Sequence, residues 1–194
     1  ASRAKTVLVE VDPRLVSLFQ RAYPNVEIVA RRDPIDRRLL KADAQASPAY
    51  LPTLLRRNPS MFPADGGYLK ADPKRVTYWT DRFAALGPRP HVGVAWRGGV
   101  ARTGDAKSTT IEALTPFLRA AIPDGCLISL QYGEDVQERQ AAEALGAWVP
   151  VANPSVDLLD DMETLAAQIE ALDTVVSISG LNAHMAGALG KPGV

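Results

Sequence analysis

Residues able to bind a phosphate group gather near the end of the chain, between an apolar run and a stretch of small side chains. Residues 175–179 are typical of a buried strand, 180–182 of a turn, and 183–189 of an alanine-rich helix. A strand that enters a helix through a glycine turn aims free backbone N–H groups and the positive end of the helix dipole above the sheet. Any parallel sheet contains ordinary strand-turn-helix segments, so this segment alone leaves phosphate binding open.

A second polar group follows an earlier apolar run at residues 91–96. Arg97, Gly98 and Gly99 come directly after it, and the two glycines allow backbone N–H groups to approach a ligand closely. The guanidinium of Arg97 is a suitable partner for a phosphate, although the neighbouring loop could also turn it to solvent. This stretch is therefore the second candidate part of an anion site.

The elements expected to position these residues alternate along the chain. Apolar runs predict strands, and apolar residues at helical spacing predict helices. Alternation of the two predicts an α/β protein with a doubly wound parallel sheet, whose ligands bind beyond the carboxyl ends of the strands. The expected strands are 6–11, 26–30, 91–96, 126–131, 147–151 and 175–179, and the expected helices are 13–22, 73–86, 111–121, 134–145, 162–172 and 183–189.

A domain boundary is expected near Gly87 and Pro88. Residues 31–67 contain five prolines and little periodicity, which predicts a loop with short helical pieces such as 51–56. After this loop, Asp72 and Pro73 mark the start of a helix that Gly87 and Pro88 end. The interpretation is a first α/β domain over residues 1–87, including this linking helix, and a second domain over residues 88–194.

Composition excludes several classes of protein. The 22 basic residues balance the 22 acidic ones, which argues against a nucleic-acid binder. No apolar stretch reaches the roughly 18 residues that a transmembrane helix needs. The single cysteine, Cys126, lies in an apolar run, where a buried strand residue is expected and not a nucleophile. One cysteine allows no internal disulfide, which agrees with a cytoplasmic location.

Four collinear stretches resemble a known group of enzymes. ALDTVVSISGLNAHMAGALGKP, at residues 171–192, resembles the donor-site segment of family nine glycosyltransferases, which include the ADP-heptose:lipopolysaccharide heptosyltransferases. It is more similar still to bacterial tetratricopeptide-repeat proteins that carry such a transferase domain. The other three stretches are VEVDPRLVSLFQRAYPNVEIVAR, FPADGGYLKADPKRVTYWTDRFAALG with HVGVAWRGG, and CLISLQYGE.

The resemblance implies a GT-B architecture, with two Rossmann-like domains and a nucleotide-sugar donor between them. The first domain would be partial and the second would bind the donor. It further implies glycosyl transfer to a protein or glycan acceptor, without a cofactor. No Asp-x-Asp pair or histidine cluster is present to hold a metal. Two alternatives are a non-catalytic nucleotide-sugar-binding or scaffolding module and a nucleotide-sugar epimerase of the same fold.

The resemblance also assigns roles to residues after the first strands of the second domain. Lys107 before Ser108 is similar to the basic residue that contacts donor phosphates, whereas without the resemblance it would be a solvated loop lysine. Tyr132 would line the base pocket, and Glu134 or Glu138 would accept hydrogen bonds from ribose hydroxyls. The competing interpretation of Glu134 is an acidic residue favoured in the first turn of a helix.

Three further positions are assigned near the two last helices. Met162 would form an apolar wall for the base, or, with Asp161 as helix N-cap, belong to the core. His184 matches a histidine of the donor loop and is equally interpretable as a structural residue. Ser179 departs from the heptosyltransferases, which have an aspartate there, so a preference for ADP-heptose does not carry over. The expected donor-binding residues are Arg97, Gly98, Gly99, Lys107, Ser108, Tyr132, Glu134, Met162, Ser179, Gly180, Asn182 and His184.

Both ends of the chain interrupt elements that continue in the resembling proteins. Those proteins have a further strand and an acidic loop before the position of Ala1, and another strand after Val194. We therefore expect the chain to be part of a longer polypeptide. A displacement at the anomeric carbon needs a base near the acceptor hydroxyl. By the resemblance, that base lies upstream of Ala1, and this chain alone would be inactive.

Overall fold

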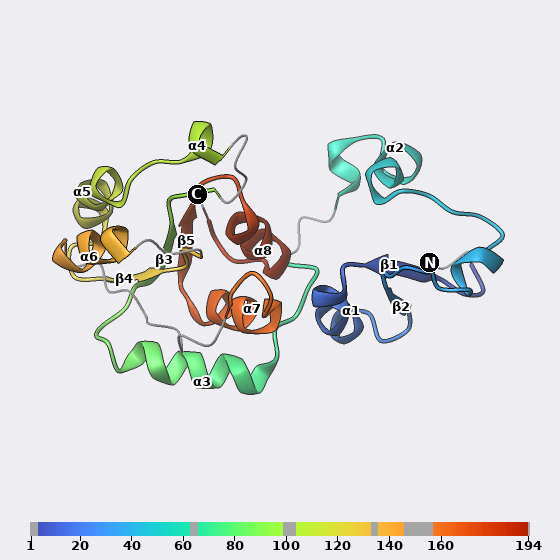
Figure 1. Cartoon of the computed structure of the whole chain (residues 1–194), viewed down its shortest axis with the longest axis horizontal. Coiled ribbons are helices and arrows are strands. Elements are labelled where there is room, and N and C mark those ends of the chain that lie inside the picture. The colour runs from blue at the N-terminus through green and yellow to red at the C-terminus, as the bar shows by residue number, and fades with distance from the viewer. Residues whose placement is uncertain (1–3, 63–65, 99–103, 133–135, 146–156, 194) are drawn as a thin grey trace. The chain divides into compact units, whose positions relative to one another are not determined.

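The computed structural model of the 194-residue chain describes residues 4–62, 66–98, 104–132, 136–145 and 157–193. The chain folds as two compact units, Ala1–Gly66 and Gly67–Val194. Both contain parallel strands and helices, which confirms the predicted α/β class. Figure 1 shows the elements of each unit.

The first unit contains one βαβ motif. Strand β1 (Leu8–Val11) pairs in parallel with β2 (Glu27–Ala30), as the sequence predicted. A 3-10 turn, η1 (Pro13–Leu15), and helix α1 (Val16–Ala22) connect them, and Asp12 caps the turn by accepting a hydrogen bond from the Arg14 amide. Leu18 of α1 is fully buried and, with Ile28 and Val29 of β2, forms the small core of this unit.

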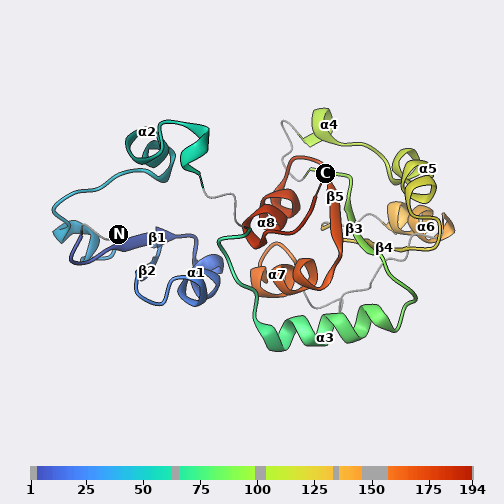
Figure 2. The same cartoon turned by 180° about the vertical axis from the view of Figure 1, so that it is seen from behind.

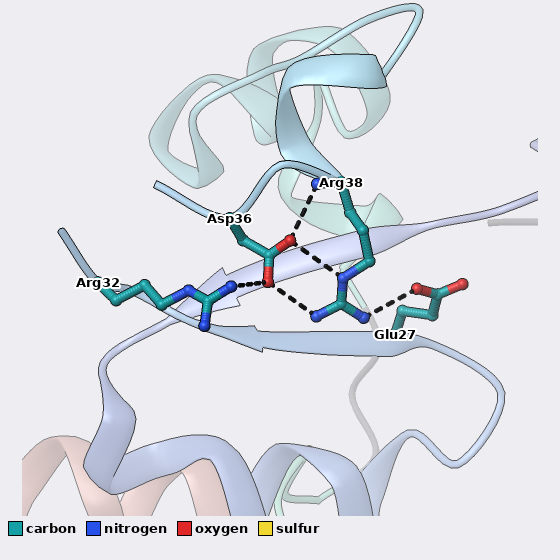
Figure 3. A network of polar contacts seen from close by, with 4 residues as sticks. All are labelled: Glu27, Arg32, Asp36 and Arg38. Carbon is teal, nitrogen blue, oxygen red and sulfur yellow. Dashed lines mark hydrogen bonds and ion pairs between the residues drawn. The ribbon is translucent and has the colours of Figure 1, made fainter. Parts of the chain in front are cut away.

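The remainder of the first unit has short helical pieces, as the prolines predicted. They are η2 (Leu39–Lys41), η3 (Pro48–Tyr50), α2 (Leu51–Leu55) and η4 (Pro59–Met61). A charged network joins this segment to β2, with Asp36 at its centre (Figure 3). Asp36 accepts hydrogen bonds from Arg32 at 2.9 Å and from the amide and guanidinium of Arg38, which also contacts Glu27.

The second unit is built on a three-stranded parallel sheet. Its strands are β3 (His91–Ala95), β4 (Cys126–Ser129) and β5 (Thr174–Ser177), in the order β4-β3-β5. Helices α5 (Ile111–Ala121) and α6 (Val136–Ala144) lie on one side, and α7 (Met162–Ala171) and α8 (Leu181–Leu189) on the other (Figures 1 and 2). Cys126, expected to be buried, begins β4 and is half-buried.

The core of the second unit fills both sides of the sheet. On the α5 side, apolar side chains of β3 and β4 pack against that helix; this cluster contains Val92, Val94, Trp96, Ile111, Leu118 and Leu127. On the other side, α7 is buried along nearly its whole length, with Leu165 and Ile169 completely inaccessible. Every strand of β3 to β5 is therefore held between helices, as expected for parallel strands.

Helix α3 (Pro73–Ala84) begins as predicted and belongs to the second unit. Asp72 caps it by accepting hydrogen bonds from the amides of Lys74 and Arg75. Arg75 also binds Asp161 and the Thr164 hydroxyl of α7, at 3.1 and 2.8 Å. The sequence placed this helix in the first domain and the boundary at Gly87, whereas the units divide after Gly66. Helix α3 does end shortly before Gly87, at Ala84, but its packing on α7 places it in the second unit.

The segment that starts the second unit lies on the C-terminal end of α8. The amides of Tyr68 and Leu69 both donate to the carbonyl of Ala188, at 2.7 and 2.8 Å. Gly67 lies so close to the backbone of Leu189 and Gly190 that a Cβ would collide with it. This end of α8 is therefore fixed by residues that precede α3.

The stretch before Lys107, expected to be a loop, ends in a short helix, α4 (Gly104–Lys107). The strand expected at 147–151 lies outside the described residues. Within the described part of the chain, no helix combines the length and apolar character needed to cross a membrane.

Candidate functional site

Polar groups converge where β3, β4 and β5 end. The chain runs from β3 to β4 on one side and then crosses to β5 on the other, so the direction of strand progression changes at β3. In doubly wound sheets, ligands bind beyond the carboxyl ends of the strands at such a point. The residues found there come from the segment after each strand and from the start of α8. We therefore place the candidate site at this edge.

The segment after β3 is joined to a loop that lies further along the chain. The amide of Gly98 donates to the Ser108 hydroxyl at 3.0 Å, and the amide of Thr109 donates to the Trp96 carbonyl at 2.9 Å. These bonds bring Ser108 to the end of β3. The side chain of Lys107, the residue before Ser108, is exposed. Its ammonium is therefore accessible from solvent.

Arg97 forms an ion pair with Glu138 of α6. The guanidinium nitrogen and the carboxylate oxygen are 3.0 Å apart, and the two side chains are about one-third exposed, at 35% and 30%. By the resemblance, Glu134 or Glu138 was expected to accept hydrogen bonds from ribose hydroxyls, and Arg97 was a candidate for phosphate. In the structure they bind each other, so an incoming phosphate would compete with Glu138 for the guanidinium.

Gln131 is a site residue that the sequence analysis missed. It directly follows Leu130 beyond the end of β4 and is only 4% exposed. Its side-chain oxygen accepts hydrogen bonds from the amides of Trp96 and Arg97, at 3.1 and 2.9 Å. Its side-chain nitrogen donates to the carbonyls of Arg97 and Tyr132, both at 3.1 Å. A glutamine at the end of an apolar run was a signal, because a buried amide requires partners.

The N-terminus of α8 faces this edge without a capping side chain. Gly180 is the N-cap residue and makes no side-chain hydrogen bond to the first turn. The first amides of a helix have no intrahelical acceptor, so they are available to an anion. The φ of Gly180 is −171°, which any residue adopts, so the value of glycine here is its small size. Phosphate binding at residues 180–182 stays a prediction.

Asn182 and His184 differ sharply in exposure. Asn182 is 2% exposed, and its side-chain amide donates to the carbonyl of Leu130 at 3.1 Å. It was expected to contact a donor directly, but in the structure it joins α8 to β4. His184 is exposed, and its backbone amide donates to the Gly180 carbonyl at 3.1 Å. Of the two, the side chain of His184 is therefore the one accessible to a ligand.

The remaining expected residues divide into three groups. Met162 is 2% exposed at the start of α7, with Asp161 as N-cap, so it is a core residue of the second unit. Tyr132 is half-buried and Ser179 is exposed at the strand ends. Gly99 and Glu134 lie outside the described residues. The described site residues that the structure brings together are Arg97, Gly98, Ser108, Gln131, Tyr132, Gly180 and Asn182.

A small cavity lies beside this edge, between β5 and α8. Its volume is about 180 Å³, and its lining residues are Val175, Ser177, Ala183, Ala186, Gly187, Lys191 and Gly193. Ligand pockets usually measure about 300–1,000 Å³. We therefore place the site at the strand ends, where polar groups converge, and not in this cavity. No group of three or more potential metal ligands occurs among the described residues.

Comparison with known proteins identifies one informative relative. Protein FlbA of Caulobacter vibrioides is 31% identical over 198 residues, which cover 94% of this chain. The chain spans only 32% of the length of that protein. No protein-family model matches the chain. No solved structure matches it either.

Proposed function

We propose that the second unit is the donor-binding domain of a glycosyltransferase that moves a sugar from a nucleotide-activated donor to a protein or glycan. The observation that carries the proposal is the meeting of Arg97, Gly98 and the uncapped start of α8 at one edge of a parallel sheet. Such an edge suits a diphosphate. The four collinear stretches support the sugar-transfer part, and with it a GT-B arrangement and a cytoplasmic location.

The proposed chemistry is displacement at the anomeric carbon with the nucleoside diphosphate as leaving group. The bond from the anomeric carbon to the phosphate oxygen breaks, and the acceptor oxygen forms a bond to the same carbon. Negative charge grows on the leaving phosphate, and it is stabilised by cations and by aligned N–H donors. Arg97, Lys107 and the first amides of α8 would supply them. The acceptor hydroxyl must lose a proton to a base, for which the resemblance indicates residues before Ala1.

A binding module without catalytic activity is the second candidate. The carboxylate that the structure brings to the site, Glu138, is 3.0 Å from the guanidinium of Arg97. That oxygen of the carboxylate is engaged by the guanidinium and is not directed at an open position where an acceptor hydroxyl would bind. This pairing favours a module that binds a nucleotide sugar and leaves proton transfer to another part of the polypeptide.

Calorimetry with ADP, UDP and GDP tests the binding step. Lys107→Ala removes a charge-assisted contact and should weaken the preferred nucleotide by about 1.5–3 kcal/mol. Lys41→Ala, which removes an exposed lysine of the first unit, is the control and should leave affinity unchanged. Equal nucleotide affinities in Lys107→Ala and the unaltered chain would remove Lys107 from the site.

Transfer of a labelled sugar separates the two candidate functions. The 194-residue chain should bind nucleotide without transferring sugar, whereas a longer natural polypeptide that contains it should transfer. Transfer by the chain alone at the same rate would refute the upstream base. Binding without transfer in either case would favour the non-catalytic module.

A further inference from the structure

The pairing of β3 with β4 ends abruptly at the candidate site. The last regular rung joins the Leu130 amide to the Val94 carbonyl at 2.8 Å. In a parallel ladder, the next rung would join the Trp96 amide to the Leu130 carbonyl. Instead, the Trp96 amide donates to the side chain of Gln131, and the Leu130 carbonyl accepts from the side chain of Asn182. Two side-chain amides therefore replace one backbone rung.

The carbonyl of Trp96 is also taken out of the ladder. It accepts a hydrogen bond from the Thr109 amide at 2.9 Å, so neither backbone group of Trp96 pairs with the backbone of β4. Gln131 then extends to the next residue and binds both the amide and the carbonyl of Arg97. The backbone of Arg97 is thus held on both sides by one buried, neutral side chain.

We infer that Gln131 and Asn182 are positioning residues that keep the ends of β3 and β4 unpaired and so shape the donor-phosphate site. Gln131 fixes the segment that carries Arg97 and Gly98. Asn182 fixes the first turn of α8 to β4. Together they set the positions of the guanidinium and of the helix amides that would face one diphosphate. The inference rests on the proposed function for its ligand, but not for the loop geometry.

An apolar residue at position 131 would have a specific effect. In Gln131→Leu, the Trp96 amide loses its side-chain partner and can return to a backbone acceptor of β4 by extending the ladder. The new backbone hydrogen bond then recovers much of the lost stability, while Arg97 and Gly98 move. A positioning role therefore predicts loss of binding with little loss of stability, whereas a purely structural role predicts the reverse.

The experiment compares Gln131→Leu with Gln168→Leu in the same chain. Gln168 is a matched control because it is 1% exposed in α7 and its side chain has no hydrogen-bond partner among the described residues. Hydrogen exchange of the Arg97 amide, the melting temperature and ADP, UDP and GDP affinities are measured for each. We expect Gln131→Leu to accelerate Arg97 exchange at least tenfold and weaken the best nucleotide at least tenfold. Gln168→Leu should do neither.

A Gln131→Glu variant adds a pH readout that a structural role would not produce. The ionised carboxylate accepts hydrogen bonds but cannot donate to the carbonyls of Arg97 and Tyr132, and its charge repels phosphate. Protonation restores one donor and removes the charge. Nucleotide affinity relative to the unaltered chain should therefore rise as pH falls from 8 to 5.

Two results would overturn the inference. The first is an unchanged exchange rate of the Arg97 amide in Gln131→Leu. The second is a nucleotide affinity of Gln131→Glu that equals that of the unaltered chain at every pH. If the unaltered chain binds none of the three nucleotides, the proposed function fails. The exchange comparison still decides then whether Gln131 positions the segment, so the two failures are distinguishable.

Discussion

Each unit has one polar side chain at the centre of a hydrogen-bond network, and the two differ in charge. Asp36 of the first unit is 6% exposed and Gln131 of the second is 4% exposed. Asp36 is ionised and held by Arg32 and Arg38, whose side chains are 61% and 56% exposed (Figure 3). Gln131 is neutral and bonded to backbone groups. Charge makes the first network sensitive to pH and salt, and neutrality makes the second insensitive to both.

The two units also differ in how much apolar surface they bury. Among the described residues of the first unit, the buried apolar side chains are Leu18, Ile28 and Val29. The second unit buries apolar side chains on both sides of its sheet. Large apolar side chains are instead exposed along one segment of the first unit, at Leu40, Tyr50, Leu51, Leu54, Leu55, Met61 and Phe62. We therefore expect the second unit to respond strongly to packing changes and the first to changes in solution conditions.

The largest effect is expected from Gly67→Ala. A Cβ at this position collides with backbone atoms of Leu189 and Gly190, which cannot move aside as a flexible side chain would. Overpacking of this kind costs about 3 kcal/mol. Urea unfolding of the second unit measures the loss.

Gly187→Ala is the matched control for that substitution. Gly187 is an interior residue of α8, and apart from its chain neighbours and the nearby backbone of the helix itself, no described atom lies within 4 Å of the position that its Cβ would occupy. Alanine is preferred over glycine inside a helix by about 0.5–1 kcal/mol, so this variant should be slightly stabilised. Destabilisation by both variants would contradict the collision at Gly67.

Asp161→Ala should have an intermediate effect on the second unit. Asp161 caps α7 by accepting hydrogen bonds from the amide and hydroxyl of Thr164, at 2.9 and 2.7 Å, and it also pairs with Arg75. Loss of an N-cap costs about 1–2 kcal/mol. Asp161→Asn keeps a capping oxygen and should cost less. Equal losses in the two variants would show that the charge, and not the cap, matters.

The stability contributed by Asp161 should also depend on pH. Burial acts to raise the pKa of Asp161, but the hydrogen bonds from Thr164 and the charge of Arg75 outweigh it and lower the pKa below its usual range. A lowered pKa means that the stabilisation is present above the unfolded value, near 4, and is lost as pH falls. Unfolding curves between pH 7 and pH 2 should converge for the unaltered chain and Asp161→Asn.

The smallest effect is expected from Asp36→Asn, and it should be confined to the first unit. Hydrogen bonds from Arg38, aided by the charge of Arg32, hold the pKa of Asp36 far below its usual range. Its stabilisation should therefore be lost as pH falls below about 4, and it should weaken in 1 M salt. Amide NMR signals of β1 and β2 should report both changes, while those of β3 stay constant. Asp43→Asn, an exposed carboxylate variant, is the control.

Local signals predicted the elements better than their assembly. Helix α5 has the predicted bounds, because Thr110 and the apolar spacing after it define both its cap and its buried face. The unit to which α3 belongs depends on the contact of Arg75 with Asp161, which lies 86 positions away. The role of Gln131 was hidden for the same reason, since its partners Trp96 and Arg97 follow another strand, β3. Sequence patterns indicate what a residue prefers locally, but not which distant backbone groups lack partners.

Helix α8 is held at both ends, and this gives it a mechanical role. Its C-terminal end binds Tyr68 and Leu69 through the Ala188 carbonyl, and its first turn binds β4 through Asn182. The nine residues of the helix form a rod about 14 Å long. A helix in a close-packed interior transmits a push along its axis with little compression. We therefore expect a displacement of the chain at Gly67 along the axis of α8 to reach Leu130, which is bonded to the other end of the helix.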